Sequence, residues 1–170
     1  MHTVTVQKTI GVSDVEAWKV LDDFGGVEKY HPLVERSPLK GEQRSGEGAM
    51  RTCHFHGGGS IEEKITGYEE GVGYEVTVTD PGPMPLESAV ADLRVTPAGA
   101  ERSTIRLAMH FKPKYGPIGW LMAKTVMKSQ LRKTMGNLID GLEEHAMTGA
   151  IVGPNRSGPD GTSEVVETTA

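Results

Sequence analysis

The sequence predicts an α+β fold, in which a curved antiparallel sheet of seven strands wraps around one long C-terminal helix, with two short helices after the first strand. Residues 2–10 alternate polar and apolar side chains, as a half-buried strand does. Between residues 33 and 112, Gly, Pro and Asp recur about every 8 to 14 residues and separate further alternating segments, which is typical of a strand meander. A final segment ending near Met147 has the spacing of an amphipathic helix.

Two short helices are expected after the first strand. Ser13 and Glu16 match a capping box, in which a hydroxyl and a carboxylate satisfy free amide groups at the start of a helix. This helix is expected to stop at Gly25. One more turn is expected over residues 27–31, because Pro32 disfavours helical backbone in the residue before it.

The meander is expected to contain six strands, over residues 33–42, 48–56, 60–69, 73–80, 86–96 and 102–112. Short connections between them imply antiparallel pairing. The helix that follows should begin after Pro117. Gly136 and Gly141 inside it each cost about 1 kcal/mol relative to alanine, which indicates close packing or a bend.

Length and composition indicate one domain over residues 1–148 and a disordered tail over residues 149–170, which are rich in Gly, Pro, Ser and Thr. The net charge of −5 provides no global field for nucleic acid or an acidic membrane. A single cysteine excludes an intramolecular disulfide, and no apolar run approaches the roughly 20 residues of a membrane helix. We therefore expect a cytoplasmic protein without membrane insertion or nucleic-acid partner; its oligomeric state stays open.

Five short motifs, taken in order, point to a known family. They are residues 17–24 (AWKVLDDF), 30–34 (YHPLV), 48–51 (GAMR), 62–69 (EEKITGYE) and 111–113 (FKP). Their order and spacing resemble the START/Bet v 1-like (SRPBCC) superfamily, and in particular its polyketide cyclase/dehydrase branch. Tyr30 stands where this family usually has Trp. The resemblance covers residues 1 to about 147 and implies a helix-grip fold.

The resemblance also implies a cavity between the sheet and the C-terminal helix, which takes a small hydrophobic molecule such as a lipid, a polyketide or an isoprenoid. No cofactor is implied. Together with the strand and helix patterns, it gives the residues expected to bind the ligand: Cys53, Phe55, Ile65, Tyr74, Val76, Ala89, Ala91, Leu93, Leu107, Met109, Met127, Leu131 and Met135.

His54 and His56 raise the question of a metal site. A strand would place them on one face about 7 Å apart, close enough to share an ion if a third ligand arrives. The spacing from Gly48 to Glu62 also comes near the first motif of the cupins, which are metal-binding β-barrels. However, the second cupin motif has no counterpart and a long terminal helix is foreign to that barrel. We therefore expect no metal, and an exposed histidine pair.

Neighbouring residues on this strand point to opposite sides, so one of two sets faces the cavity: Arg51, Cys53 and Phe55, or Met50, Thr52, His54 and His56. The resemblance and the apolar character of Cys53 and Phe55 favour the first set. Cys53 is then interpreted as a small buried apolar residue rather than a nucleophile.

The candidate catalytic residues are Tyr30, His31, Arg51 and Glu63. Arg51 inside an apolar cavity would be costly unless paired, and Glu63 on the next strand is the natural partner. The alternative is that both lie on an ordinary solvated face. Catalytic members of the family would use such groups to stabilise an enolate and to move a proton. Two main functions stay open, a binding module and a cofactor-independent cyclase or dehydratase, with a cupin-like metal enzyme as the third.

Overall fold

One antiparallel sheet with the strand order β1-β8-β7-β6-β5-β4-β2 makes up most of the fold, and β3 pairs with β4 beside β2. The computed structural model describes residues 1–154, without the side chains at positions 120, 123 and 125. The strands are β1 His2–Ile10, β2 Val34–Arg36, β3 Leu39–Lys40, β4 Met50–Phe55, β5 Ser60–Glu69, β6 Gly73–Asp80, β7 Leu86–Pro97 and β8 Ser103–Pro113. The helical elements are α1 Asp14–Asp22, η1 Phe24–Lys29, α2 Gly116–Met122, η2 Ala123–Met127 and α3 Lys128–Thr148.

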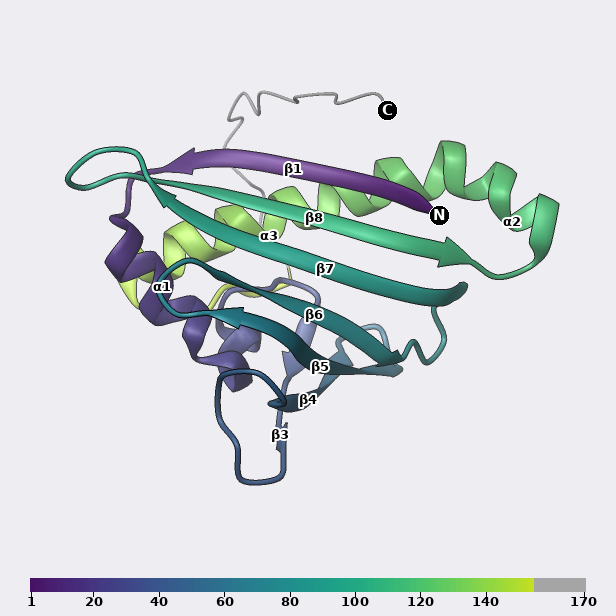
Figure 1. Ribbon diagram of the computed structural model, residues 1–170, viewed down its shortest axis with the longest axis horizontal. Helices are drawn as coiled ribbons and strands as arrows, with labels where there is room; N and C mark the ends of the chain where they lie inside the picture. The colour runs from purple at the N-terminus through teal and green to yellow at the C-terminus, as the bar shows by residue number, and fades with distance from the viewer. Residues whose placement is uncertain (155–170) are drawn as a thin grey trace.

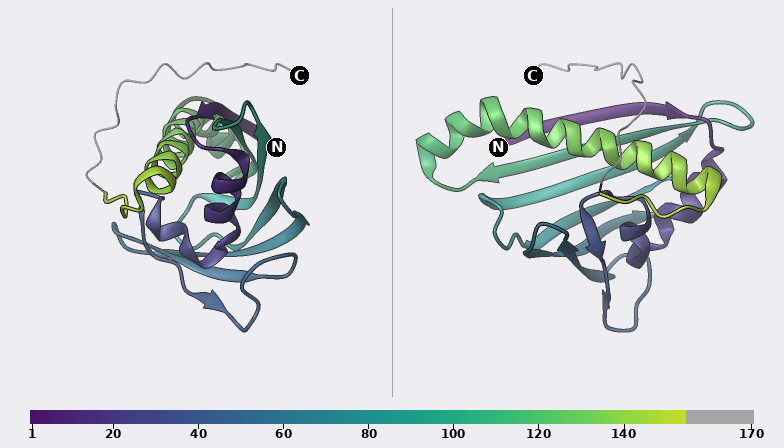
Figure 2. Two further views of the ribbon diagram at one scale, coloured as in Figure 1. Left: turned by 90° about the vertical axis from the view of Figure 1, so that its left-hand side faces the viewer. Right: turned by 180° about the vertical axis from the view of Figure 1, so that it is seen from behind.

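The sheet curves around α3, which lies along its concave face (Figures 1 and 2). The α1 and η1 helices close one end of this curve between the sheet and the end of α3 (Figure 2). The α+β class, the antiparallel order and the terminal helix predicted from the sequence are confirmed. No helix within residues 1–154 combines the length and the apolar character required to cross a membrane.

The single strand expected over residues 33–42 is wrong, because β2 and β3 are separated by Ser37 and Pro38. Pro38 has no N–H to donate to a strand ladder. The Ser37 hydroxyl turns inward and donates to Gly25 O at 2.6 Å, and the Ser37 side chain is 1% exposed. The break therefore anchors the edge of the sheet to η1.

The start of α1 follows the prediction, since Ser13 Oγ accepts a hydrogen bond from Glu16 N at 3.2 Å. Its end does not. The helix ends at Asp22, and Gly25 lies inside the 3₁₀ turn η1 rather than stopping a helix. The extra turn expected over residues 27–31 thus comes earlier, over Phe24–Lys29.

The C-terminal helix is continuous in direction but contains a π-helical turn, η2, between α2 and α3 (Figure 1). Of the two glycines expected to indicate close packing, only Gly141 does so: a Cβ there would lie 2.0 Å from Tyr30 O, whereas a Cβ at Gly136 would meet nothing within 4 Å. Val152, just after the helix, donates to Lys29 O at 2.9 Å and is buried. The predicted tail beyond residue 154 lies outside the described residues.

Candidate ligand-binding cavity

A cavity of about 360 Å³ lies between the concave face of the sheet and α3. All the residues predicted to bind ligand line it except Ile65 and Met127. Ile65 is 1% exposed and belongs to the packed core. Met127 lies in η2, where a π turn takes up an additional residue and shifts the spacing that an ideal α-helix would have.

Sequence reasoning missed nine lining residues, namely Val27, Leu33, Val34, Ile61, Val78, Met84, Leu86, Thr134 and Leu138. Val78 and Leu138 extend periodic patterns that were already visible and could have been found from them. Leu33 lies in the connection from η1 to β2, and Met84 in the connection from β6 to β7, where no periodicity indicates which way a side chain points.

Arg51, Cys53 and Phe55 line the cavity, whereas His54 and His56 do not. Arg51 and Cys53 are 6% and 2% exposed, and His56 is exposed. No group of three or more His, Cys, Asp or Glu side chains among the described residues has an arrangement that could hold a metal ion.

Arg51 and Glu63 form an ion pair at the cavity wall. They are opposite each other in the β4–β5 ladder, and Arg51 Nε donates to Glu63 Oε2 at 2.7 Å. Their side chains are only 8% and 14% exposed. Burial by itself would lower the pKa of Arg51, but the Glu63 carboxylate, together with Cys53, Tyr74 and Tyr30, outweighs burial and the pKa is raised. The guanidinium is therefore charged at any physiological pH.

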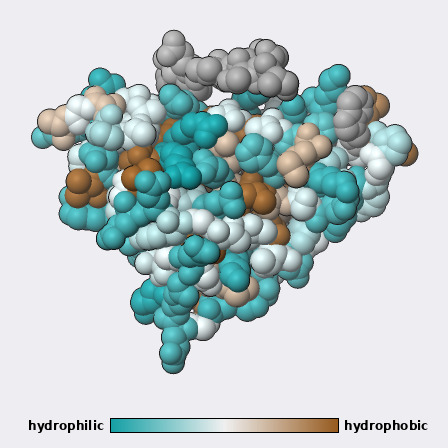
Figure 3. All heavy atoms as spheres, viewed as in Figure 1, coloured by the Kyte–Doolittle hydropathy of each residue, from teal (hydrophilic) through white to brown (hydrophobic). Residues whose placement is uncertain are grey.

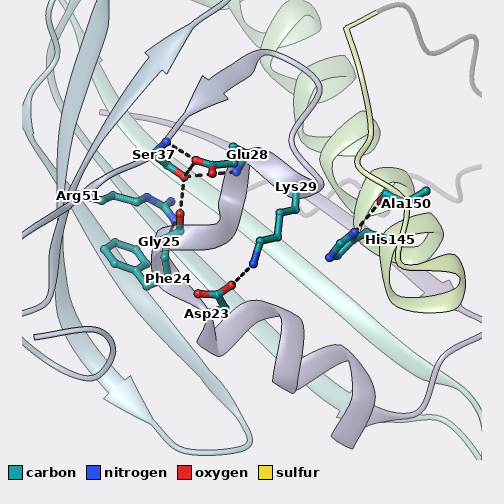
Figure 4. A network of polar contacts seen from close by, with 9 residues as sticks. All are labelled: Asp23, Phe24, Gly25, Glu28, Lys29, Ser37, Arg51, His145 and Ala150. Atoms are coloured by element: carbon teal, nitrogen blue, oxygen red, sulfur yellow. Dashed lines mark hydrogen bonds and ion pairs between the residues drawn. The ribbon is translucent and has the colours of Figure 1, made fainter.

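The Arg51 guanidinium is held from two further directions by η1. Its Nη1 donates to Phe24 O at 2.7 Å, and its Cζ lies 4.0 Å from the centre of the Phe24 ring, within the range of a cation–π contact. Figure 4 shows the neighbouring contacts: the next carbonyl, Gly25 O, accepts a hydrogen bond from the Ser37 hydroxyl, which also bonds to Glu28. The position of Arg51 is thus fixed by η1 as well as by the sheet.

Cys53, Tyr30 and Tyr74 contribute neutral polar groups. Burial, together with the nearby Glu63, raises the pKa of the Cys53 thiol to about 12, although Arg51 opposes this shift, so the thiol stays protonated at neutral pH. The hydroxyls of Tyr30 and Tyr74 are hydrogen-bonded to each other, and burial raises the pKa of both. Neither a thiolate nor a phenolate is therefore present at neutral pH.

His31 lies at the cavity wall as a neutral imidazole. Burial lowers its pKa to about 4, with a smaller contribution from the Arg51 charge, while the Glu63 charge opposes the shift. The Leu33 N–H donates to His31 Nδ1 at 3.2 Å, so the ring proton sits on Nε2. The ring therefore offers a hydrogen-bond donor at Nε2 rather than a free lone pair. The structure thus brings Tyr30, His31, Arg51 and Glu63 to one cavity.

A wider and more open depression of about 720 Å³ lies on the outside of the molecule, near η1, β2 and β3. Its lining is mostly polar and includes Glu28, Lys29, Arg36, Glu42 and Arg44. Small-molecule sites are usually enclosed and predominantly apolar. The interior cavity is therefore the stronger candidate, although it is the smaller of the two.

Solved structures similar to this chain share its fold. The protein XoxI from Bacillus cereus superposes with a TM-score of 0.71 at 15% identity, covering 87% of this chain and 97% of that protein. A Thermobifida fusca protein gives 0.69 at 21% identity, with coverages of 86% and 93%. Truncated norcoclaurine synthase from Thalictrum flavum gives 0.66 at 14% identity, with coverages of 86% and 94%. At these identities the likeness shows the fold alone.

A search of curated protein sequences found no significant match. In contrast, the family model described as polyketide cyclase / dehydrase and lipid transport matches residues 1–145, which is most of the chain. This match agrees with the fold, the helix packed in the curve of the sheet and the cavity between them. The chain belongs to the polyketide cyclase/dehydrase and lipid transport family.

Proposed function

We propose that the chain binds one small, mostly apolar molecule in the cavity between the sheet and α3. The observation that carries the proposal is the cavity itself, which is lined mainly by aliphatic and aromatic side chains and has most of its polar groups near Arg51. Lipids, polyketides and isoprenoids all combine an apolar body with a small number of polar atoms. Family membership supports a ligand-binding role of this kind.

The dimensions of the cavity narrow the ligand class. A volume of about 360 Å³ is near the lower end of the roughly 300–1,000 Å³ typical of small-molecule sites. A single aliphatic chain or a small ring system fits this space, whereas a lipid with two long chains is too large. Since Arg51 and Glu63 neutralise each other, a ligand with a neutral polar end, such as a ketone or an alcohol, suits the site better than an anion.

A fluorescence titration with Prodan tests the proposal, because Prodan is a neutral naphthyl ketone whose emission shifts to the blue in apolar surroundings. We expect saturable binding with one site per chain. Ala91→Phe should weaken it at least tenfold, because the added ring would occupy the cavity. Val90→Phe is the matched control, since Val90 is the neighbouring residue and does not line the cavity. Absent saturation, or equal binding by both variants, would contradict the proposal.

One observation favours a second function, general acid/base catalysis in the same cavity. Glu63 Oε2 accepts hydrogen bonds from both Arg51 and Cys53, while none of the hydrogen bonds among the described residues engages Glu63 Oε1. This oxygen is therefore available to accept a proton from a ligand. The His31 Nε2–H could donate to the carbonyl oxygen of the same ligand. This arrangement suits enolisation of a ketone, a step shared by cyclisation and dehydration reactions.

Exchange of hydrogen for deuterium next to the carbonyl of 2-tetralone measures enolisation without knowledge of the natural substrate. In D₂O, followed by NMR, an enzyme should exchange these hydrogens faster than buffer does, and Glu63→Gln should abolish the increase while Prodan still binds. Glu62→Gln on the same strand is the control, because Glu62 pairs with Lys40 away from the cavity. Exchange at the buffer rate would leave binding as the sole function.

A further inference from the structure

The segment around α2 and η2 exposes an unusual number of large apolar side chains. Five of them lie within residues 115–126: Tyr115 is 74% exposed, Ile118 72%, Leu121 59%, Met122 51% and Val126 66%. In the rest of the described chain, the exposed large apolar residues are Met1, Val15, Leu33, Met147 and Ile151. We call the five residues within 115–126 the α2 surface. Isolated exposed apolar residues are ordinary, but a contiguous group of them usually marks an interaction site.

The α2 surface projects from the molecule rather than covering its core. Figure 1 shows α2 extending beyond the end of the sheet, and the view from behind in Figure 2 shows the same. In Figure 3, a few hydrophobic spheres are visible at this end of the molecule among hydrophilic ones. Ile118 and Met122 are four residues apart within α2, which places them on one side of that helix. The surface is therefore an apolar ridge on a projecting helix, not the wall of a groove.

The charge around this ridge is opposite to that of the whole chain. Residues 102–139 contain eight Lys and Arg and neither Asp nor Glu, which leaves ten basic against 23 acidic residues in the remainder. Lys112, Lys114, Lys124 and Lys128 lie in or next to α2 and η2. Lys112 also pairs with Glu87 at 2.8 Å. Burial is the main cause that lowers the pKa of His2, and the nearby charges of Lys128 and Lys124 lower it further. Lys112, Lys114, Lys124 and Lys128 thus lie at the end of the molecule where β1 begins, whereas Arg102 and Arg106 lie toward the opposite end of β8.

We propose that the α2 surface docks onto the interface of an anionic lipid bilayer. A helix that presents apolar side chains together with lysines lies in the bilayer interface, with the apolar face among the acyl chains and the lysines near anionic headgroups. A projecting ridge can enter a bilayer without a matching groove. A symmetric contact with a second copy would instead bring the same lysines against one another. This inference does not depend on which ligand the cavity binds.

Co-sedimentation of the full chain with vesicles tests the proposal. Vesicles of phosphatidylcholine and phosphatidylglycerol (3:1) should bind the protein, vesicles of phosphatidylcholine alone should bind it at least tenfold more weakly, and 300 mM NaCl should reduce binding to the anionic vesicles. An apolar variant (Ile118→Gln, Leu121→Gln, Val126→Gln) and a charge variant (Lys114→Gln, Lys124→Gln, Lys128→Gln) should each lose binding. For the charge variant we expect about a hundredfold loss, or roughly fivefold for each lysine.

Matched controls replace equally exposed side chains elsewhere. Val15→Gln, Met147→Gln and Ile151→Gln change residues that are 59%, 65% and 73% exposed, and Lys19→Gln, Lys29→Gln and Lys40→Gln remove the same charge. Both control variants should bind vesicles like the parent. Sedimentation equilibrium of the parent and the apolar variant provides a second measurement.

Binding to anionic vesicles that depends on both sets of residues in and beside α2 supports the proposal. No binding to anionic vesicles overturns it, and so does equal binding by the apolar and control variants. A dimer of the parent that the apolar variant abolishes also overturns it, because a second copy would then cover the ridge. Prodan binding, measured in parallel, should be unchanged in the apolar variant, so a failure of this proposal is separate from a failure of the cavity proposal.

Discussion

Removing one partner of the Arg51–Glu63 pair should destabilise the protein far more than removing both. At an N–O distance of 2.7 Å and an effective dielectric constant of about 20, the attraction between the two charges is about 6 kcal/mol. Desolvating two side chains that are only 8% and 14% exposed costs several kcal/mol for each ion, so the pair as a whole contributes little net stability. A single replacement, however, leaves one buried charge without its partner.

A double-mutant cycle measures this difference. We expect Arg51→Met and Glu63→Met each to lower the free energy of unfolding by about 3 to 5 kcal/mol. The double variant should lie within about 1 to 2 kcal/mol of the parent, since it loses mainly the hydrogen bond to Phe24 O. Urea denaturation at pH 7, followed by circular dichroism, gives each value. Single effects that add up in the double variant, or that are each below about 1 kcal/mol, would contradict a buried pair whose two charges depend on each other.

The same double variant separates a structural role of the pair from a role in binding. Because it should fold, its affinity for Prodan reports on the cavity alone. We expect about a tenfold loss, the value of one hydrogen bond to the polar end of a ligand. Unchanged affinity would mean that the pair does not orient the ligand.

Three further predictions concern His31, the space in the cavity and Gly141. Folding lowers the pKa of His31 from about 6.5 to about 4, so the unfolded chain takes up the proton first. The free energy of unfolding should thus be at its full value above pH 6.5 and fall by about 2 kcal/mol towards pH 4, a figure reduced for the partial exposure of the ring. His31→Gln should lack this pH-dependent fall when urea denaturation is measured over the same pH range. Ala91→Leu should change the free energy of unfolding by less than about 1 kcal/mol, because the cavity has room for the larger side chain. Ala17→Leu in the solid core should cost about 1 to 3 kcal/mol. Equal losses in the two variants would argue against an empty cavity. Gly141→Ala should lower the free energy of unfolding by about 1 to 3 kcal/mol, because its Cβ would clash with the Tyr30 carbonyl. Gly136→Ala should raise it by up to about 1 kcal/mol, because a Cβ there meets nothing. Thermal unfolding that ranks the two variants the other way would contradict the packing described for the helix.

The parts of the fold that repeat along the chain were predictable from the sequence. Alternation fixed the strands β5 to β8 closely, and the three-to-four-residue period identified the terminal helix. The hairpin around the glycines at 57–59 also set the register, since Arg51 and Glu63 are equally distant from residue 57 and are opposite each other in the ladder. Their contact could therefore be expected before the structure was known.

Features that depend on contacts between distant segments could not be predicted in this way. The break at Ser37 depends on Gly25 and Glu28 of η1, and the approach of α3 to η1 depends on the absence of a side chain at Gly141. The π turn η2 moved Met127 out of the expected position, because helical periodicity assumes an unbroken α-helix. Likewise, the protonated nitrogen of His31 is set by the Leu33 N–H, which no sequence pattern reveals.

Methyl NMR of the methionines tests the central claim most directly, namely that the space between the sheet and α3 takes an apolar ligand with a neutral polar end. Three of the eight methionines, Met84, Met109 and Met135, line the cavity, whereas Met1, Met50, Met122, Met127 and Met147 do not. Titration of ¹³C-methyl-labelled protein with decan-1-ol should shift the signals of the first three and leave the others unchanged, and decanoate should produce these shifts only at higher concentration. Shifts confined to the second group, or none at all, would contradict the account.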